Sequence, residues 1–146
     1  MERSLIRLTS SHFVIVVAGL VTILAVGWIV VMPAWEDLYA REFGLPRLEK
    51  QYRFRWGTVT ITRDGVVEEL EGIVSVSPGG HFAKMGVRQH DLPFAHHGYG
   101  AAWMYSALMA GEGGHPAEFE VINGDDWAGG DPRPRTIRVP PRNAPK

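Results

Sequence analysis

The chain of 146 residues has no cysteine, which excludes disulfide bonds, thiolate metal sites, iron–sulfur clusters and covalently attached haem. Its net charge is only −1, so no general electrostatic field favours binding to nucleic acid. The chain also lacks a Gly-x-Ser-x-Gly sequence, a His-Glu-x-x-His sequence and a phosphate-binding glycine loop. These absences predict a protein that is not an enzyme, with no catalytic residues and no cofactor.

Charged residues are missing altogether from residues 13–32, which read FVIVVAGLVTILAVGWIVVM. A helix of this length spans about 30 Å, the thickness of the hydrocarbon core of a bilayer. The apolar region of a signal peptide is shorter, and no small-x-small cleavage site follows this one. A core helix of this length would normally carry a polar stripe. The sequence therefore predicts one retained transmembrane helix over residues 13–32.

The orientation of this helix depends on the basic residues at its two ends. Arg3 and Arg7 lie in the N-terminal tail, residues 1–12, and Arg41 and Arg47 follow the helix. The positive-inside rule therefore decides only narrowly. Because the N-terminal tail is short, we expect it on the cytoplasmic side of the inner membrane and the C-terminal domain in the periplasm.

Two groups of residues in and after the span are predicted to contact lipid or partner helices. Small residues at helical spacing allow another helix to approach closely, and aromatic residues at the membrane surface form an interfacial belt. The small group is Ala18, Gly19, Thr22 and Ala25, and the aromatic group is Trp28, Trp35, Tyr39 and Phe43. The expected partners are the lipid bilayer and integral membrane protein subunits.

Residues 33–50 are predicted to form a juxtamembrane helix and linker that ends at Gly44 and Pro46. Such a helix is either a simple interfacial segment or a docking surface for a neighbouring membrane subunit. Beyond it, residues 140–146 form a basic, proline-rich tail. A tail of this composition is disordered alone, or lies on anionic headgroups or an acidic partner.

Residues 51–139 read as one small α+β domain. Period-two patterns predict strands at 52–56, 59–61, 73–76, 119–122 and 136–139, with a break at Gly57 and turns at Asp64-Gly65 and Asn123-Gly124. Helices are expected at 81–87 and 101–110. We expect a partly open barrel or sandwich with two helices. Its predicted core consists of Ile73, Val74, Val76, Phe82, Val87, Leu92, Leu108, Phe119 and Val121.

The segment 72–91, GIVSVSPGGHFAKMGVRQHD, resembles the PDZ domains of bacteria. The family pattern there is a glycine, an apolar strand, a Pro-Gly turn, a short helix and a Gly-Asp pair. Ala83, Gly86, Val87 and Asp91 match this pattern, whereas His90 replaces the glycine of the pair. The resemblance extends over roughly residues 55–139. It departs from the family at Pro93, which interrupts the next strand, at His97-Gly98 in place of Asn-Gly, and at the long linker 125–135.

The resemblance implies a groove that binds the C-terminal ends of peptides. A PDZ domain adds such a peptide to a sheet edge and captures its terminal carboxylate with backbone N–H groups. The other possibility is a filled groove, with Trp56 and Trp103 as core residues. The residues implied for the groove are Arg55, Trp56, Gly57, Thr58 and Val59 in a carboxylate-binding loop, and Ala101, Met104, Tyr105 and Leu108 on the facing helix.

Four histidines raise the question of a metal site. His90, His96, His97 and His115 occur near Asp91 in the sequence, and imidazole is a common metal ligand. However, His96 and His97 are adjacent, so on a strand they point to opposite faces. No His-x-x-x-His pair is present. We therefore expect solvated or capping histidines and no metal site.

Two classes of function remain open. The first is an accessory subunit of a larger membrane complex, of respiratory, photosynthetic, transport or secretion type. The second is a membrane-anchored PDZ adaptor or sensor that binds C-terminal peptides. Because no effector domain accompanies the anchor and the small domain, the sequence favours the subunit.

Overall fold

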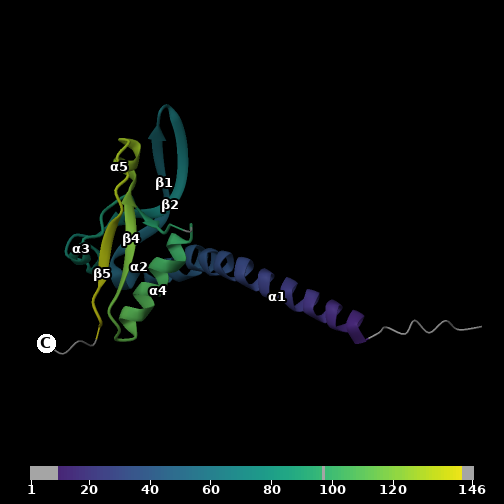
Figure 1. Cartoon of the computed structure of the whole chain (residues 1–146). Helices are drawn as coiled ribbons and strands as arrows, with labels where there is room; N and C mark the ends of the chain where they lie inside the picture. Colours follow the sequence, from purple (N-terminus) through teal and green to yellow (C-terminus); the bar gives the residue numbers. More distant parts are fainter. Residues whose placement is uncertain (1–9, 97, 143–146) are drawn as a thin grey trace, which may run out of the picture. The chain divides into compact units, whose positions relative to one another are not determined.

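A computed structural model describes residues 10–96 and 98–142 (Figure 1). The chain divides into two compact units, Met1–Ala34 and Trp35–Lys146. The first contains most of an apolar helix, and the second is an α+β domain.

Helix α1, Ser10–Tyr39, contains the uncharged stretch predicted to cross a membrane. Within the described residues, the helical segment that begins at Phe13 is the one long and apolar enough for this. The large apolar side chains from Phe13 to Val31 are 42–71 % exposed, so no core of the described chain covers them. Pro33 lies inside this helix, which continues to Tyr39.

The helical path continues past Gly44 and Pro46, where the sequence predicted its end. A π-helical turn η1, Ala40–Gly44, leads directly into helix α2, Leu45–Tyr52. Pro46 lies in the first turn of α2, where its missing N–H needs no helical partner. Ala40, Leu45 and Leu48 are buried. The segment predicted as a linker therefore contributes to the core of the domain.

Strands β1, Phe54–Arg63, and β2, Val66–Val76, form a long antiparallel hairpin. Asp64 and Gly65 both have positive φ, as a type I′ turn requires, which confirms the predicted Asp-Gly turn. Gly57 does not break the first strand as predicted. The irregularity lies between Arg55 and Trp56, where the register shifts and β1 remains continuous.

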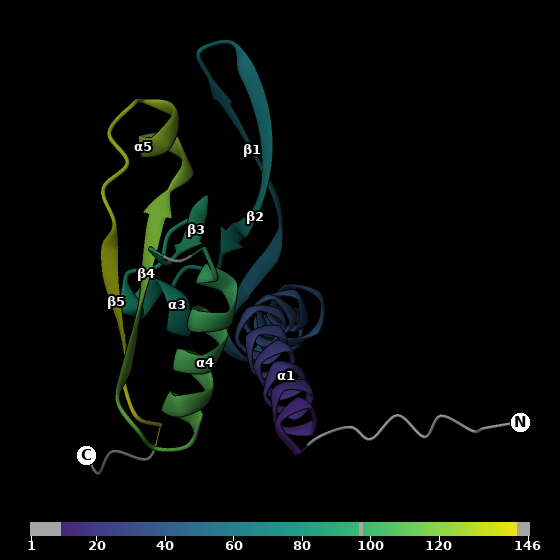
Figure 2. The same cartoon turned by 45° about the vertical axis from the view of Figure 1, so that its right-hand side comes forward.

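A second sheet has the strand order β3-β4-β5 and is antiparallel throughout. Its strands are β3, Asp91–Phe94, β4, Ala117–Asn123, and β5, Arg135–Val139. Helix α3, His81–Met85, precedes this sheet, and helix α4, Gly100–Glu112, connects β3 to β4. The upper half of the β1–β2 hairpin extends away from the sheet (Figure 2).

The α+β class is confirmed, but the strands form two small sheets and no closed barrel is present in the described residues. The domain also has more helix than predicted, because α2 and α5 add to α3 and α4. Asn123-Gly124 is not a turn: Asn123 caps helix α5, Gly124–Ala128, by accepting a hydrogen bond of 3.0 Å from the Asp125 N–H.

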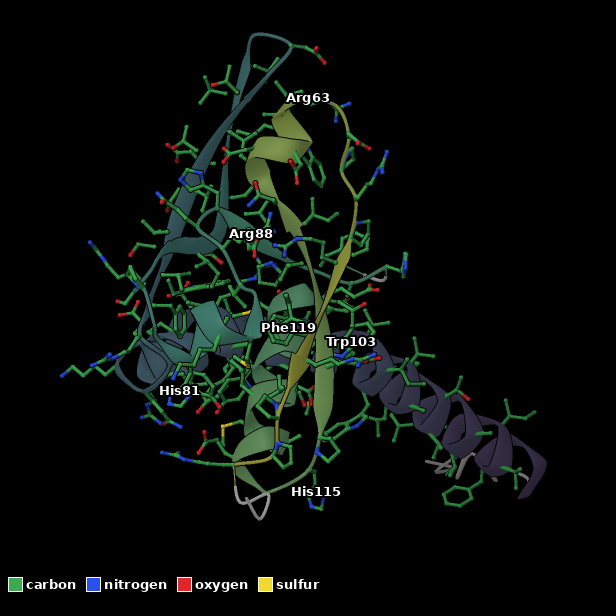
Figure 3. The ribbon with its side chains drawn as sticks, turned by 90° about the vertical axis from the view of Figure 1, so that its left-hand side faces the viewer. Arg63, His81, Arg88, Trp103, His115 and Phe119 are labelled. Atoms are coloured by element: carbon green, nitrogen blue, oxygen red, sulfur yellow. The ribbon has the colours of Figure 1, made fainter. Side chains whose placement is uncertain are left out.

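Most of the predicted core is confirmed. Ile73, Phe82, Val87, Leu92, Leu108, Phe119 and Val121 are all buried. Phe82 stacks on Phe54, with 4.3 Å between ring centroids. Val74 and Val76 are only half-buried, and Val74 is the residue that the strand irregularity leaves unpaired. Figure 3 labels Phe119 on β4, where it is almost fully buried.

Candidate interaction surfaces

The face of α4 predicted to line a peptide groove is part of the core. Ala101, Met104 and Leu108 are all buried, the last two completely. They belong to the same cluster as Phe54, Phe82 and other residues of the strands and helices. These three side chains are therefore not accessible to a peptide in this structure.

Tyr105, the fourth predicted residue of this helix, contacts the segment that precedes β1. A Cβ atom on Gly44 would lie 2.7 Å from the ring of Tyr105, so a side chain at position 44 would have to displace that ring. The Tyr39 ring meets the Tyr105 ring edge to face, at 6.0 Å. Burial, and then the Tyr39 side chain, raise the pKa of Tyr105. Residues 39–45 thus cover α4 at the position where the PDZ resemblance implied one wall of a groove, and η1 lies beside α4.

A buried carboxylate connects this segment to the first turn of α4. Asp37 accepts a hydrogen bond of 2.9 Å from the backbone N–H of Ala102. It also forms an ion pair of 2.6 Å with Arg41, whose guanidinium reaches Glu71 of β2 at 3.4 Å. The side chain of Tyr99, at the N-cap position of α4, does not cap the helix. Asp37 therefore supplies the negative charge that the positive end of the helix favours.

The predicted carboxylate-binding loop lies within strand β1. Arg55, Trp56, Gly57, Thr58 and Val59 all belong to this strand and pair with residues of β2. The side chain of Glu49 accepts the Trp56 N–H at 2.8 Å, and Val59 is buried. The prediction of a loop here is wrong, because the backbone continues through Gly57 in an extended conformation.

His90 and Asp91 have a clear structural role. His90 adopts φ of +65°, a left-handed conformation that normally favours glycine. Asp91 is completely buried, and both of its carboxylate oxygens accept hydrogen bonds from Arg135, at 2.8 and 2.7 Å. The Arg88 N–H and the Asn123 side-chain amide also donate to it. Asp91 therefore joins the loop after α3 to β4 and β5.

The histidines do not gather around a common point. His90 contacts Asp125 at 3.2 Å, and His81 packs against the ring of Tyr52. His97 lies outside the described residues. Among residues 10–96 and 98–142, no three His, Asp or Glu side chains are placed to hold a metal ion.

A third acidic residue, Glu112 at the end of α4, holds the start of the C-terminal tail. Its carboxylate accepts hydrogen bonds from Gln51, Tyr52 and Arg142. The Arg142 N–H also donates to the Gly111 carbonyl at 3.0 Å. Burial alone would raise the pKa of Glu112, but the hydrogen bonds from Arg142 and Tyr52 outweigh it, so the pKa is lowered. Burial, and then the bond to Glu112, raise the pKa of Tyr52.

The residues predicted to contact lipid or partner helices lie at the surface of their own units. In α1 the Thr22 hydroxyl donates back to the Ala18 carbonyl at 2.8 Å, so its polar group is satisfied within the helix. Ala18, Gly19 and Ala25 are exposed, as is Trp28. In the second unit the side chains of Trp35 and Phe43 are 60 and 58 % exposed, and that of Tyr39 is 37 % exposed.

Sequence reasoning missed the roles of Asp37, Arg135 and Glu112. A signal exists for Asp37, because Arg41 follows it by one helical turn and aromatic residues surround it. Arg135 and Glu112 have no local signal. Their partners Asp91 and Arg142 are 44 and 30 residues away in the sequence.

Comparisons with protein-family models, with curated proteins and with solved structures found no match to this chain. The fold and the contacts of its residues are therefore the basis for the function proposed below.

Proposed function

We propose that this protein is a non-catalytic accessory subunit of a larger membrane complex, with α1 as a single transmembrane anchor. The observation that carries the proposal is the exposure of the apolar side chains between residues 13 and 31. Fourteen large apolar side chains on all sides of a helix are stable in lipid but costly in water. The N-terminus lies in the cytoplasm and the domain lies in the periplasm, as the short basic tail favours.

The second unit is a PDZ-like domain that acts as a docking block. The positive φ of His90, the buried Asp91 and the left-handed Gly86 after α3 support this assignment, because each suits the Gly-Asp and helix-end pattern of the family. The element order from β2 to β5 supports it as well.

The covered face of α4 favours a subunit over a peptide adaptor. An adaptor needs a free wall on α4 and a carboxylate-binding loop. Here Met104 and Leu108 are completely buried, residues 39–45 lie against Tyr105, and residues 55–59 are in a strand. The binding energy of the protein then resides in permanent contacts of α1 and of exposed aromatics such as Trp35 and Phe43.

Loss of close helix packing tests this function. Replacing Ala18, Thr22 and Ala25 by leucine fills the small-residue face of α1 and releases the protein from its complex. A matched control replaces Val16, Ile23 and Gly27, on the opposite face, by leucine, and this variant stays in the complex. Blue-native electrophoresis of mild detergent extracts, followed by mass spectrometry of the partners, measures both.

The alternative hypothesis, a peptide-binding adaptor, predicts the opposite results for two variants. Gly57→Val would abolish capture of C-terminal peptides, while the triple leucine variant would assemble normally. That pair of results would overturn the subunit proposal.

A further inference from the structure

A groove of about 1020 Å³ lies apart from the α4 face considered above. It is lined by Gln51 and Tyr52 of α2, by His81, Lys84 and Met85 of α3, and by parts of β4 and β5. From α4 it includes only Gly111 and Glu112, in the last turn. Ligand pockets usually enclose about 300–1,000 Å³, so this groove is large enough for a short peptide.

One wall of the groove includes Arg138 and Val139, the last two residues of β5, which is the outer strand of its sheet. β4 pairs on both sides, whereas β5 pairs with β4 alone. Among residues 10–96 and 98–142, no backbone hydrogen bond joins β5 to any segment other than β4. The N–H and C=O groups on the outer side of such a strand are available to a further strand.

Helix α3 forms the opposite wall. Figure 1 shows α3 beside β5, and Figure 3 labels His81 on this helix. At one end Arg135 of β5 donates a hydrogen bond of 3.1 Å to the Gly86 carbonyl, which closes the space between the two elements. Lys84 of α3 and Val139 of β5 both line the groove. A strand edge opposite a helix is the arrangement in which extended peptides bind by strand addition.

The charges that line the groove favour an acidic ligand. Lys84 and Arg138 are exposed, and neither forms an ion pair within the described part of the chain. Of the two acidic residues in the groove, Glu112 is already paired with Arg142. Only Glu118, the cross-strand neighbour of Arg138, opposes the two cations. Met85, Ala117 and Val139 provide apolar surface in the lining of the groove.

We propose that this groove binds an extended peptide with acidic side chains. The peptide adds as a strand to the outer edge of β5, and its carboxylates bind Lys84 and Arg138. The groove includes neither the anchor nor the covered face of α4. A failure of this proposal would therefore not overturn the subunit role, and a failure of the subunit role would not overturn this proposal.

The test uses the full chain in detergent micelles and a fluorescein-labelled peptide, acetyl-Asp-Val-Thr-Val-Asp-amide. Fluorescence anisotropy should show saturable binding below about 1 mM, the range of weak peptide recognition. Lys84→Glu and Arg138→Glu should each weaken binding by about tenfold, because each removes a charge-assisted hydrogen bond. Both side chains are exposed, so these variants should keep the unfolding temperature of the wild type.

Two controls separate this site from non-specific attraction. Arg63→Glu, the same charge reversal at the exposed hairpin tip, should leave the affinity unchanged. The peptide acetyl-Lys-Val-Thr-Val-Lys-amide should not bind.

A further experiment tests strand addition. N-methylation of alternate residues of the peptide should abolish binding in only one of the two alternating patterns, because only one set of N–H groups faces β5.

The proposal is overturned if the acidic peptide does not saturate, or if Arg63→Glu weakens binding as much as Lys84→Glu. Equal binding of the lysine peptide would overturn the charge argument. If neither N-methylation pattern affected affinity, strand addition to β5 would be wrong.

Discussion

Two helices of this chain are similarly apolar but lie in opposite surroundings. Between residues 13 and 31 of α1 the large apolar side chains are 42–71 % exposed, whereas Met104 and Leu108 of α4 are completely buried. Neither helix has a charged side chain in these stretches. The difference is that α4 is covered by other parts of its own unit, including η1 and β4, and α1 is not. The hydrophobicity of a helix alone therefore does not show whether it belongs in a protein core or in a membrane. The difference lies in whether other parts of the chain pack against the helix.

The largest effect is expected in the core that covers α4. Phe82→Ala removes a fully buried ring that stacks on Phe54 and should lower the free energy of unfolding by about 3–5 kcal/mol. Phe119→Ala should do the same. Urea denaturation of the detergent-solubilised chain, followed by tryptophan fluorescence, measures the change. A loss near zero at both positions would show that these rings are not core residues.

A slightly smaller effect is expected at the buried ion pair. Asp91→Asn leaves Arg135 without its charged partner and should cost about 3 kcal/mol, since removal of one member of a buried pair is strongly destabilising. The control Asp125→Asn changes an exposed carboxylate and should cost less than about 0.5 kcal/mol. Equal losses in the two variants, measured by the same denaturation, would contradict the role given to Asp91.

The contact between Glu112 and Arg142 should weaken at low pH. Because the folded pKa of Glu112 is lowered, its stabilising contribution is present above the unfolded value of about 4.3 and is lost as pH falls through the folded pKa. At pH 7 Glu112→Gln should cost about 1–2 kcal/mol. The difference in unfolding temperature between this variant and the wild type should shrink at pH 3. A difference that stays constant between pH 7 and pH 3 would refute this account.

The smallest effect is expected in α1. Ile23→Ala removes a side chain that is 71 % exposed and should change the unfolding of the second unit by less than about 0.5 kcal/mol. The same methyl groups in the core, as in Ile73→Ala, should cost about 2–5 kcal/mol. If Ile23→Ala destabilised the domain as much as Ile73→Ala, α1 would have to be a core helix.

The sequence predicts the parts of the fold that rest on local patterns. The uncharged stretch, the Asp64-Gly65 turn and α4 all follow from spacing and turn chemistry. The end of the first helical segment was predicted wrongly, because Gly44 and Pro46 usually break helices. Here a side chain at position 44 would have to displace the ring of Tyr105, and Pro46 falls in a first helical turn, which tolerates proline.

The candidate interaction surfaces were less predictable, since they depend on contacts between distant residues. No local pattern shows that residues 39–45 cover α4, because the covering depends on the position of Tyr105, some 60 residues later. The strand through Gly57 was missed for a similar reason. Its pairing with Gly72 in β2 maintains an extended backbone where the sequence alone indicated a break.

The most direct test of the central claim is the topology of α1 in the membrane. The chain has no cysteine, so single cysteines can be introduced without any other change. Ser4→Cys labels the N-terminal side, and Arg133→Cys labels an exposed position on the domain. In spheroplasts, a membrane-impermeant maleimide should react with the cysteine at position 133 and should reach position 4 only after detergent is added. Labelling of both positions without detergent would contradict a single transmembrane helix between them.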